Sequence, residues 1–174
     1  AEVVRLAEAA RAGKALRERC PRVEHARWKA PAKRRPAVAL VLQAEKGRMP
    51  HLLPLRHGRM VRSAFTFYRG SALAMAADLA TTPSSGLRVQ CCGDAHLSNF
   101  GGFATPERRI LFSINDLDET LPAPWEWDVK RLAASFAVAA RDISHSNAQA
   151  REAAARCARA YREHLRDYST KSPL

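Results

Sequence analysis

The chain's 174 residues suffice for one domain, or for one lobe of a larger protein. Its hydrophobic fraction of 47% is ordinary for a globular protein with a core, and without an apolar run of about 18 residues no membrane-spanning helix is predicted. Most of the net charge of +12 lies in residues 1–62, which hold 16 Lys and Arg against 5 Asp and Glu. Aromatic side chains do not alternate with these charges as a stacking platform requires, so we favour a solvated basic face over a nucleic-acid interface, which stays an alternative.

The N-terminal sequence and the cysteines indicate the cellular compartment. The first twenty residues carry charges throughout and lack the apolar stretch of a secretory signal. The chain does not begin with Met, so we expect its start to be processed, trimmed or incomplete. Its four cysteines have no metal-type pair spacing, which favours reduced structural thiols and a cytoplasmic protein.

The first third is predicted to be helical and irregular. Apolar residues recur at helical spacing over 2–19, and Pro21 ends that helix. Three prolines among basic residues make 21–36 an irregular connection, and 37–46 fits a short helix. We expect 47–66 to be irregular, with four arginines spread along it: Arg48, Arg56, Arg59 and Arg62.

The middle of the chain is predicted to alternate between helix, strands and loops. Alanine-rich 71–80 favours a helix with Ser71 as its N-cap. Residues 87–92 fit a short strand, 93–102 a loop, and 110–114 a second strand that enters an acidic cluster.

The last third is predicted to be a turn followed by two helices. Pro122 and Pro124 indicate the turn. Residues 127–142 and 147–168 have helical patterns, with Asn147 as a possible cap of the second helix. The predicted fold class is therefore α+β and mostly helical.

Two short segments carry the residue types of phosphoryl-transfer chemistry. Asp94 and Asn99 lie five residues apart in the predicted loop, and Asp116 follows the next strand. Such a site needs an Asp that orients a hydroxyl, and an Asn and a second Asp that bind a metal ion. Mg²⁺ takes few protein oxygens and completes its shell with phosphate and water, which suits this set better than a calcium cage.

Several nearby residues keep two interpretations. Aspartates in glycine-containing loops are also common as turn carboxylates. His96 is a candidate base or metal ligand, although a structural role in packing the loop is favoured. Asp118 and Glu119 are further metal ligands or solvated charges. Asp128 either caps the helix that follows or accepts backbone N–H groups from the 93–99 loop, and both roles would support a site.

Two of these segments resemble motifs of known protein families. CGDAHLSNFG and INDLDET resemble the His-Gly-Asp-x-His-x-x-Asn and Ile-Asp-x-Asp motifs of aminoglycoside phosphotransferase-like kinases, within the protein-kinase-like superfamily; Cys92 stands where those enzymes usually carry His. A closer resemblance, over most of the chain, is to the bacterial family called domain of unknown function 2252. Its hallmarks are similar to FYRGSALAMAADLA (67–80), to GLRVQCCGDAHLSNFGGFATPERR (86–109) and to INDLDETLPAPWEWDVKRLAAS (114–135).

The resemblance implies roles for particular residues. Asp94 would be the catalytic aspartate, Asn99 a metal ligand, Asp116 the aspartate that binds Mg²⁺ near the nucleotide phosphates, and Asp128 the helix aspartate that braces the catalytic loop. Residues 67–174 would form the catalytic-loop lobe of a kinase-like fold, preceded by a basic segment at 1–66. The glycine-rich loop and the lysine that hold a nucleotide are not found before Asp94, so we expect the chain to be a fragment that is inactive alone.

The leading hypothesis is therefore a phosphotransferase that uses ATP and Mg²⁺ on an unknown hydroxyl of a small molecule or a protein. A metal-dependent phosphoesterase is an alternative, but it needs more His ligands, and only His145 and His164 follow His96, both in predicted helical regions. Two further alternatives are a non-catalytic module that binds nucleic acid through the basic first third, and a degraded gene product.

Overall fold

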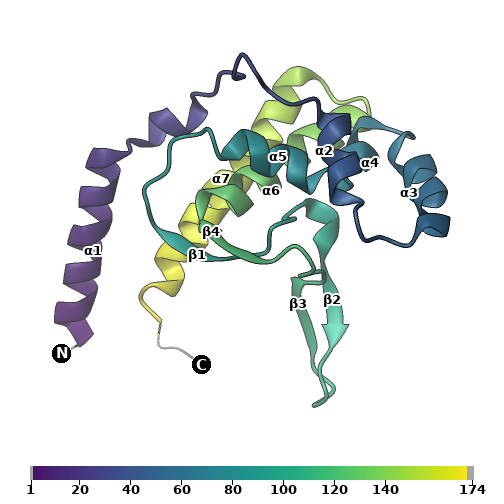
Figure 1. Ribbon diagram of the computed structural model, residues 1–174. Coiled ribbons are helices and arrows are strands. Elements are labelled where there is room, and N and C mark those ends of the chain that lie inside the picture. The colour runs from purple at the N-terminus through teal and green to yellow at the C-terminus, as the bar shows by residue number, and fades with distance from the viewer. Residues whose placement is uncertain (1, 172–174) are drawn as a thin grey trace.

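The second half of the fold is built on two long helices. The computed structural model describes residues 2–171, with side chains from residue 7 onwards. Helices α6 (Glu126–Asp142) and α7 (Asn147–Tyr168) pack side by side (Figure 1). The expected cap of α7 was wrong by one residue. Ser146 is the N-cap, since its hydroxyl accepts from Gln149 N–H while the Gln149 side chain accepts from Ser146 N–H, and the Asn147 side chain instead accepts from Arg141.

One long helix and four short ones make up most of the first half. The long helix is α1 (Glu2–Arg19), and the short ones are α2 (Ala37–Ala44), α3 (Leu53–Met60), α4 (Ala64–Arg69) and α5 (Ala72–Leu79), with single 3₁₀ turns at Arg22–Ala26 and Pro50–Leu52. Ser71 precedes α5 as predicted, but its hydroxyl bonds the carbonyl of Tyr68 at 3.1 Å and caps no N–H of α5.

The prediction that 47–66 is irregular was wrong, because this stretch contains α3 and the start of α4. Pro54 lies in the first turn of α3, where a missing N–H costs no hydrogen bond. Ser63 and Thr66 form a capping box that begins α4. Met60, at the end of α3, is buried against Gly70, where an added Cβ would lie 2.6 Å from the Met60 sulfur. Tertiary packing thus stabilises helices that the local sequence only weakly favours.

Along the chain, two small antiparallel sheets follow the helices of the first half and precede α6. Strand β1 (Arg88–Cys91) pairs with β4 (Leu121–Pro124), and β2 (Phe100–Ala104) pairs with β3 (Ile110–Ile114). Strand β4 was predicted as a turn because of its two prolines, which a two-stranded sheet tolerates where their nitrogens face away from the partner. Strand β2 was predicted as loop because Gly101 and Gly102 weaken its strand pattern.

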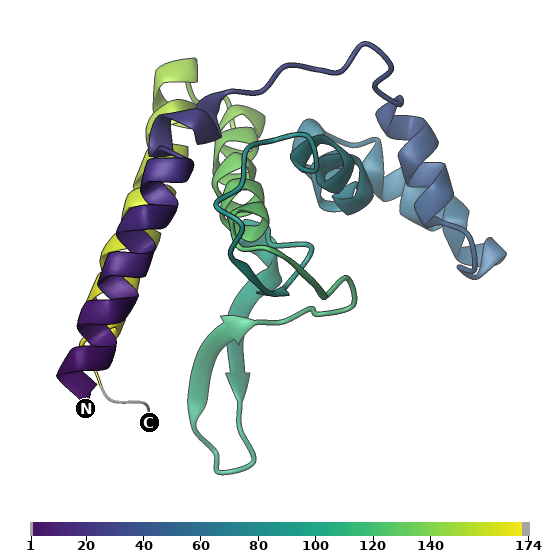
Figure 2. The same ribbon diagram turned by 60° about the vertical axis from the view of Figure 1, so that its left-hand side comes forward.

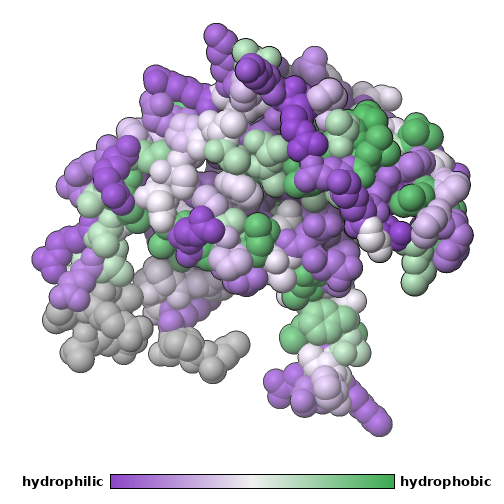
Figure 3. All heavy atoms as spheres, viewed as in Figure 1, coloured by the Kyte–Doolittle hydropathy of each residue, from purple (hydrophilic) through white to green (hydrophobic). Residues whose placement is uncertain are grey.

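The β2–β3 hairpin projects away from the helices in both ribbon views (Figure 1, Figure 2). Hydrophobic atoms are visible on it in the space-filling view (Figure 3), and Ile110 and Phe112 are 84% and 75% exposed.

The predicted fold class, α+β and mostly helical, is confirmed. Within residues 2–171, no helix is both long and apolar enough to cross a bilayer.

Candidate functional site

One face of α6 fixes the loop that joins β1 to β2. The carboxylate of Asp128 accepts hydrogen bonds from the N–H groups of Cys92, at 2.7 Å, and Gly93, at 3.1 Å. Of the two roles considered for Asp128, the loop contact is therefore the one seen. Helical spacing of i, i+3 and i+7 places two more polar side chains on the same face. The three residues are Asp128, Arg131 and Ser135.

The fully buried Ser135 continues this support further along the loop. Its hydroxyl accepts from the N–H of Leu97 at 3.0 Å and donates to the carbonyl of Leu132 at 2.6 Å. Three backbone N–H groups of the loop are thus paired by side chains of one helix, which positions the functional candidates between them.

Gly93 allows the loop to approach the acidic segment closely. Its φ of +85° lies in the left-handed region, and a Cβ built there would lie 1.9 Å from the carbonyl oxygen of Glu119. Thr120 donates from its hydroxyl to the carbonyl of Cys91 at 2.7 Å. The 116–120 segment is therefore held directly against the start of the loop.

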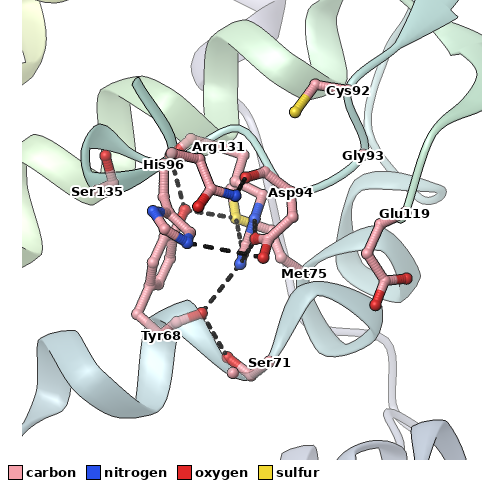
Figure 4. Close-up of polar contacts among 12 residues, drawn as sticks. Tyr68, Ser71, Met75, Cys92, Gly93, Asp94, His96, Glu119, Arg131 and Ser135 are labelled. Carbon is pink, nitrogen blue, oxygen red and sulfur yellow. Dashed lines mark hydrogen bonds and ion pairs between the residues drawn. The ribbon is translucent and has the colours of Figure 1, made fainter. Parts of the chain in front are cut away.

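Asp94 is bound by a guanidinium that was not predicted from the sequence, that of Arg131. Arg131 is 2% exposed and donates from Nε to Oδ1 of Asp94 at 2.7 Å, and its Nη2 donates to the same oxygen and to the carbonyl of Tyr68 (Figure 4). The Tyr68 hydroxyl donates to the carbonyl of Arg131 at 2.7 Å, and the guanidinium lies 4.5 Å from the Tyr68 ring centre. Burial raises the pKa of Tyr68, so the phenol stays protonated as a donor.

His96 is buried beside Asp94. Its Nε2 lies 3.6 Å from Oδ2 of Asp94, and its ring meets Phe65 edge-on with centroids 6.5 Å apart. Burial lowers the pKa of His96, which the Asp94 carboxylate only partly offsets, so the ring is neutral at neutral pH. Its Nδ1 is buried without a hydrogen-bond partner among the described residues.

Asn99 connects the loop to the acidic segment. It is 8% exposed, and its amide Nδ2 donates to the carbonyl of Asp94 at 3.0 Å, which directs the amide oxygen away from that contact. Its own carbonyl accepts from the N–H of Asn115 at 2.9 Å. The register Phe100↔Ile114 continues into this bond, so hairpin pairing brings Asp116 near Asn99.

These residues share one cavity of about 770 Å³. The loop and the acidic segment form one side of it, with Asp94, His96, Asn99, Asp116, Asp118 and Glu119. Arginines from the 47–70 stretch form another part of its lining: Arg48, Arg56, Arg59, Arg62 and Arg69. Asp94, Asn99 and Asp116 thus line one cavity, while the close approach of their oxygens needed to share a metal ion, and their chemical roles, remain predictions. Residues from both sides of the expected boundary at 66/67 line the cavity.

The oxygen donors suit a magnesium ion that keeps most of its water and phosphate ligands. Asn99 offers an amide oxygen, and Asp116 a carboxylate whose Oδ1 accepts from the N–H of Asp118 at 3.1 Å. Among residues 2–171, no three His, Cys, Asp or Glu side chains gather as a metal site. One carboxylate and one amide oxygen match the few protein ligands that Mg²⁺ commonly takes beside substrate phosphates.

Comparison with known proteins identifies the family. Neither the curated proteins nor the solved structures contain a match to this chain. A family model described as "Uncharacterized protein conserved in bacteria (DUF2252)" matches residues 48–174. The matched stretch includes the loop, the acidic segment, the helix face that supports them and the arginines of the cavity. The chain therefore belongs to this bacterial protein family.

Proposed function

We propose that the chain forms the catalytic-loop lobe of a kinase-like phosphotransferase, which transfers the terminal phosphoryl group of ATP to a hydroxyl with the help of Mg²⁺. The observation that carries this proposal is that Asp94 and Asn99, on a loop braced by Asp128, line one cavity together with Asp116 of the acidic segment. Phosphoryl transfer depends mainly on positioning and charge stabilisation, and a braced loop that presents these oxygens supplies both.

Asp94 would orient the acceptor hydroxyl and take its proton. Arg131 occupies Oδ1 of Asp94, which leaves Oδ2, next to the neutral ring of His96, as the oxygen for the substrate. A carboxylate whose second oxygen is fixed keeps one orientation, and such preorganisation lowers the cost of reaching the transition state. His96 would exclude water from that side of the carboxylate.

Asn99 and Asp116 would hold the metal ion. Mg²⁺ bound there would neutralise charge on the transferring phosphoryl group. The hydrogen bond from the Asn99 amide to the Asp94 carbonyl directs the amide oxygen away from that carbonyl, and the Asp118 N–H orients the Asp116 carboxylate. Both ligands are thus fixed before an ion arrives.

Binding of the nucleotide would need protein groups besides those that line the cavity. In related chemistry a glycine-rich loop and a lysine hold the phosphates, and within residues 2–171 no such pair lines the cavity. We therefore infer that a further protein segment completes nucleotide binding, and expect the 174-residue chain to bind Mg²⁺-ATP weakly and to show no turnover.

The phosphoesterase alternative has less support. A dinuclear hydrolase needs several His ligands near the aspartates. His145 lies in the turn between α6 and α7, and His164 stacks on Tyr168 in α7, and neither contributes to the lining of the cavity.

The test is ATP turnover by the intact bacterial protein in the presence of Mg²⁺. We expect ADP formation that depends on an added hydroxyl compound, and Asp94→Asn to lower the rate by about 10²–10⁴-fold, the usual contribution of a general base. Asp167→Asn, on the exposed end of α7, is the matched control and should leave the rate unchanged. Equal rates for the native and Asp94→Asn proteins would contradict the proposal.

A further inference from the structure

The cavity is lined by more positive charge than the protein uses for its own contacts. Arg56 donates to the carbonyl of Gly70 at 2.7 Å and lies 3.7 Å from Glu45, while Arg48 lies 3.5 Å from Glu119. Three other arginines of the lining make no ion pair or side-chain hydrogen bond with residues 7–171. They are Arg59 at the end of α3, Arg62 between α3 and α4, and Arg69 at the end of α4.

The unpaired arginines and the acidic segment belong to one cavity but do not neutralise each other. Asp116 and Asp118 line it as well, and no Arg–Asp ion pair within 4.0 Å joins these two aspartates to the arginines among the described residues. A ligand that complements such a cavity carries negative charge for the arginines and tolerates, or brings, a cation for the carboxylates.

Guanidinium groups favour a particular kind of anion. Arginine keeps its charge at any working pH, and its planar donors match the oxygens of phosphate in a bidentate way. The three arginines come from two short helices and their connection, and all three line the same cavity as Asp94. His96 is buried within the same lining, and its Nδ1 has no hydrogen-bond partner among the described residues.

We propose that Arg59, Arg62 and Arg69 bind a phosphate group of the ligand that reaches Asp94. This inference deepens the proposed function and rests on it, because it makes the substrate of the transfer site a phosphate-bearing molecule. The phosphate comes either from the nucleotide or from a phosphorylated acceptor, and the two sources share the same chemistry.

Calorimetric titration of the 174-residue chain tests the inference. The probes are ribose 5-phosphate, ribose as its neutral counterpart, and Mg²⁺-ATP.

The cavity variant is Arg59→Gln, Arg62→Gln and Arg69→Gln together. The control variant, Arg11→Gln, Arg35→Gln and Arg151→Gln, removes the same charge from exposed positions outside the cavity lining. All six arginines are exposed, so both variants should fold, and melting curves check this. The single variants Arg59→Gln and Arg62→Gln replace the triple variant if it unfolds.

We expect a phosphate ligand to bind at least about tenfold more weakly to the cavity variant than to the native or control chain, which corresponds to about 1.4 kcal/mol. Ribose should bind none of the three. Whichever of ribose 5-phosphate and Mg²⁺-ATP loses affinity identifies the source of the phosphate. Equal affinities of both variants, or no binding of either phosphate ligand to the native chain, would overturn the inference.

The outcome is separable from that of the proposed function. Ribose 5-phosphate is titrated without Mg²⁺ or nucleotide, so binding that depends on the arginines would stand even if the intact protein transferred no phosphoryl group. Conversely, turnover that depends on Asp94, combined with equal affinities of the two triple variants, would overturn this inference and leave the proposed function in place.

Discussion

Arg131 donates from Nε to Oδ1 of Asp94 at 2.7 Å, so a guanidinium from within α6 fixes the carboxylate at the centre of the site. The same helix binds the loop through Asp128 and Ser135. The position of the candidate catalytic group therefore depends on one helix face as well as on the loop's own sequence.

Replacing Arg131 should destabilise the fold markedly. Arg131→Met leaves Asp94 charged without its partner, and breaking a buried pair costs about 3–5 kcal/mol, with the lower end expected because the Asp94 side chain is 16% exposed. Arg131→Lys should be intermediate, since an ammonium lacks the planar fork. Urea unfolding measures both. Arg156→Met, which breaks the exposed pair with Glu152, should cost no more than about 0.5 kcal/mol. A similar cost for Arg131→Met and Arg156→Met would show that the Asp94 contact is not formed.

Removing the brace should loosen the start of the loop. Asp128→Ala leaves the N–H groups of Cys92 and Gly93 without their acceptor, which should cost about 1–3 kcal/mol. Hydrogen exchange of these two amides should accelerate more than that of other amides. Asp167→Ala, at an exposed position, serves as the control. Unchanged exchange at Cys92 and Gly93 in the Asp128 variant would contradict the brace.

Two glycines with the same backbone angle should respond differently to alanine. Gly93 and Gly86 have φ of +85° and +87°, so each Ala variant pays about 1–2 kcal/mol for the left-handed conformation. A Cβ at Gly86 meets nothing within 4 Å, whereas at Gly93 it would lie 1.9 Å from the Glu119 carbonyl oxygen. Thermal or urea unfolding should therefore show a clearly larger loss for Gly93→Ala. Equal losses would mean that the loop at Gly93 does not contact the segment that carries Glu119.

His96 should make stability depend on pH. Burial lowers the pKa of His96 below its ordinary value of 6.5, so the unfolded chain takes up a proton that the folded chain resists. The associated stability is complete above pH 6.5 and is lost as the pH falls below that value toward the lower folded-state pKa.

Urea midpoints at about pH 7.5 and about pH 5 measure this effect. The native chain should lose more stability on acidification than His96→Gln, whose side chain does not titrate. His51→Gln, at an exposed position, should behave like the native chain. A His96→Gln variant with the native pH dependence would contradict burial of a neutral ring.

Local sequence patterns were enough to predict the long helices and the loop residues Asp94 and Asn99. Helices α6 and α7 have strong periodicity, β1 lies in a weakly alternating stretch, and β3 is a short, mostly apolar run next to turn residues. The nearness of Asn99 and Asp116 was expected only because two strands bracket the loop, and the structure explains it by the β2–β3 hairpin.

Features that depend on tertiary contacts were missed. Arg131 was not predicted as a site residue, since nothing local distinguishes a buried arginine from a solvated one. A usable signal existed in the spacing of Asp128, Arg131 and Ser135, which puts three polar residues on one face of the predicted helix. The cavity's arginine lining was missed because α3 and the capping box of α4 were predicted as irregular chain.

The most direct test of the central claim is the placement of a divalent ion by paramagnetic line broadening. Mn²⁺ takes the same oxygen ligands as Mg²⁺ and broadens nearby amide signals. Titrated into the 174-residue chain, it should first broaden signals of residues 94–99 and 116–119. That broadening should disappear in Asp116→Asn and persist in Asp167→Asn. Broadening elsewhere only, or broadening of these segments that survives in Asp116→Asn, would contradict a metal site formed by Asn99 and Asp116.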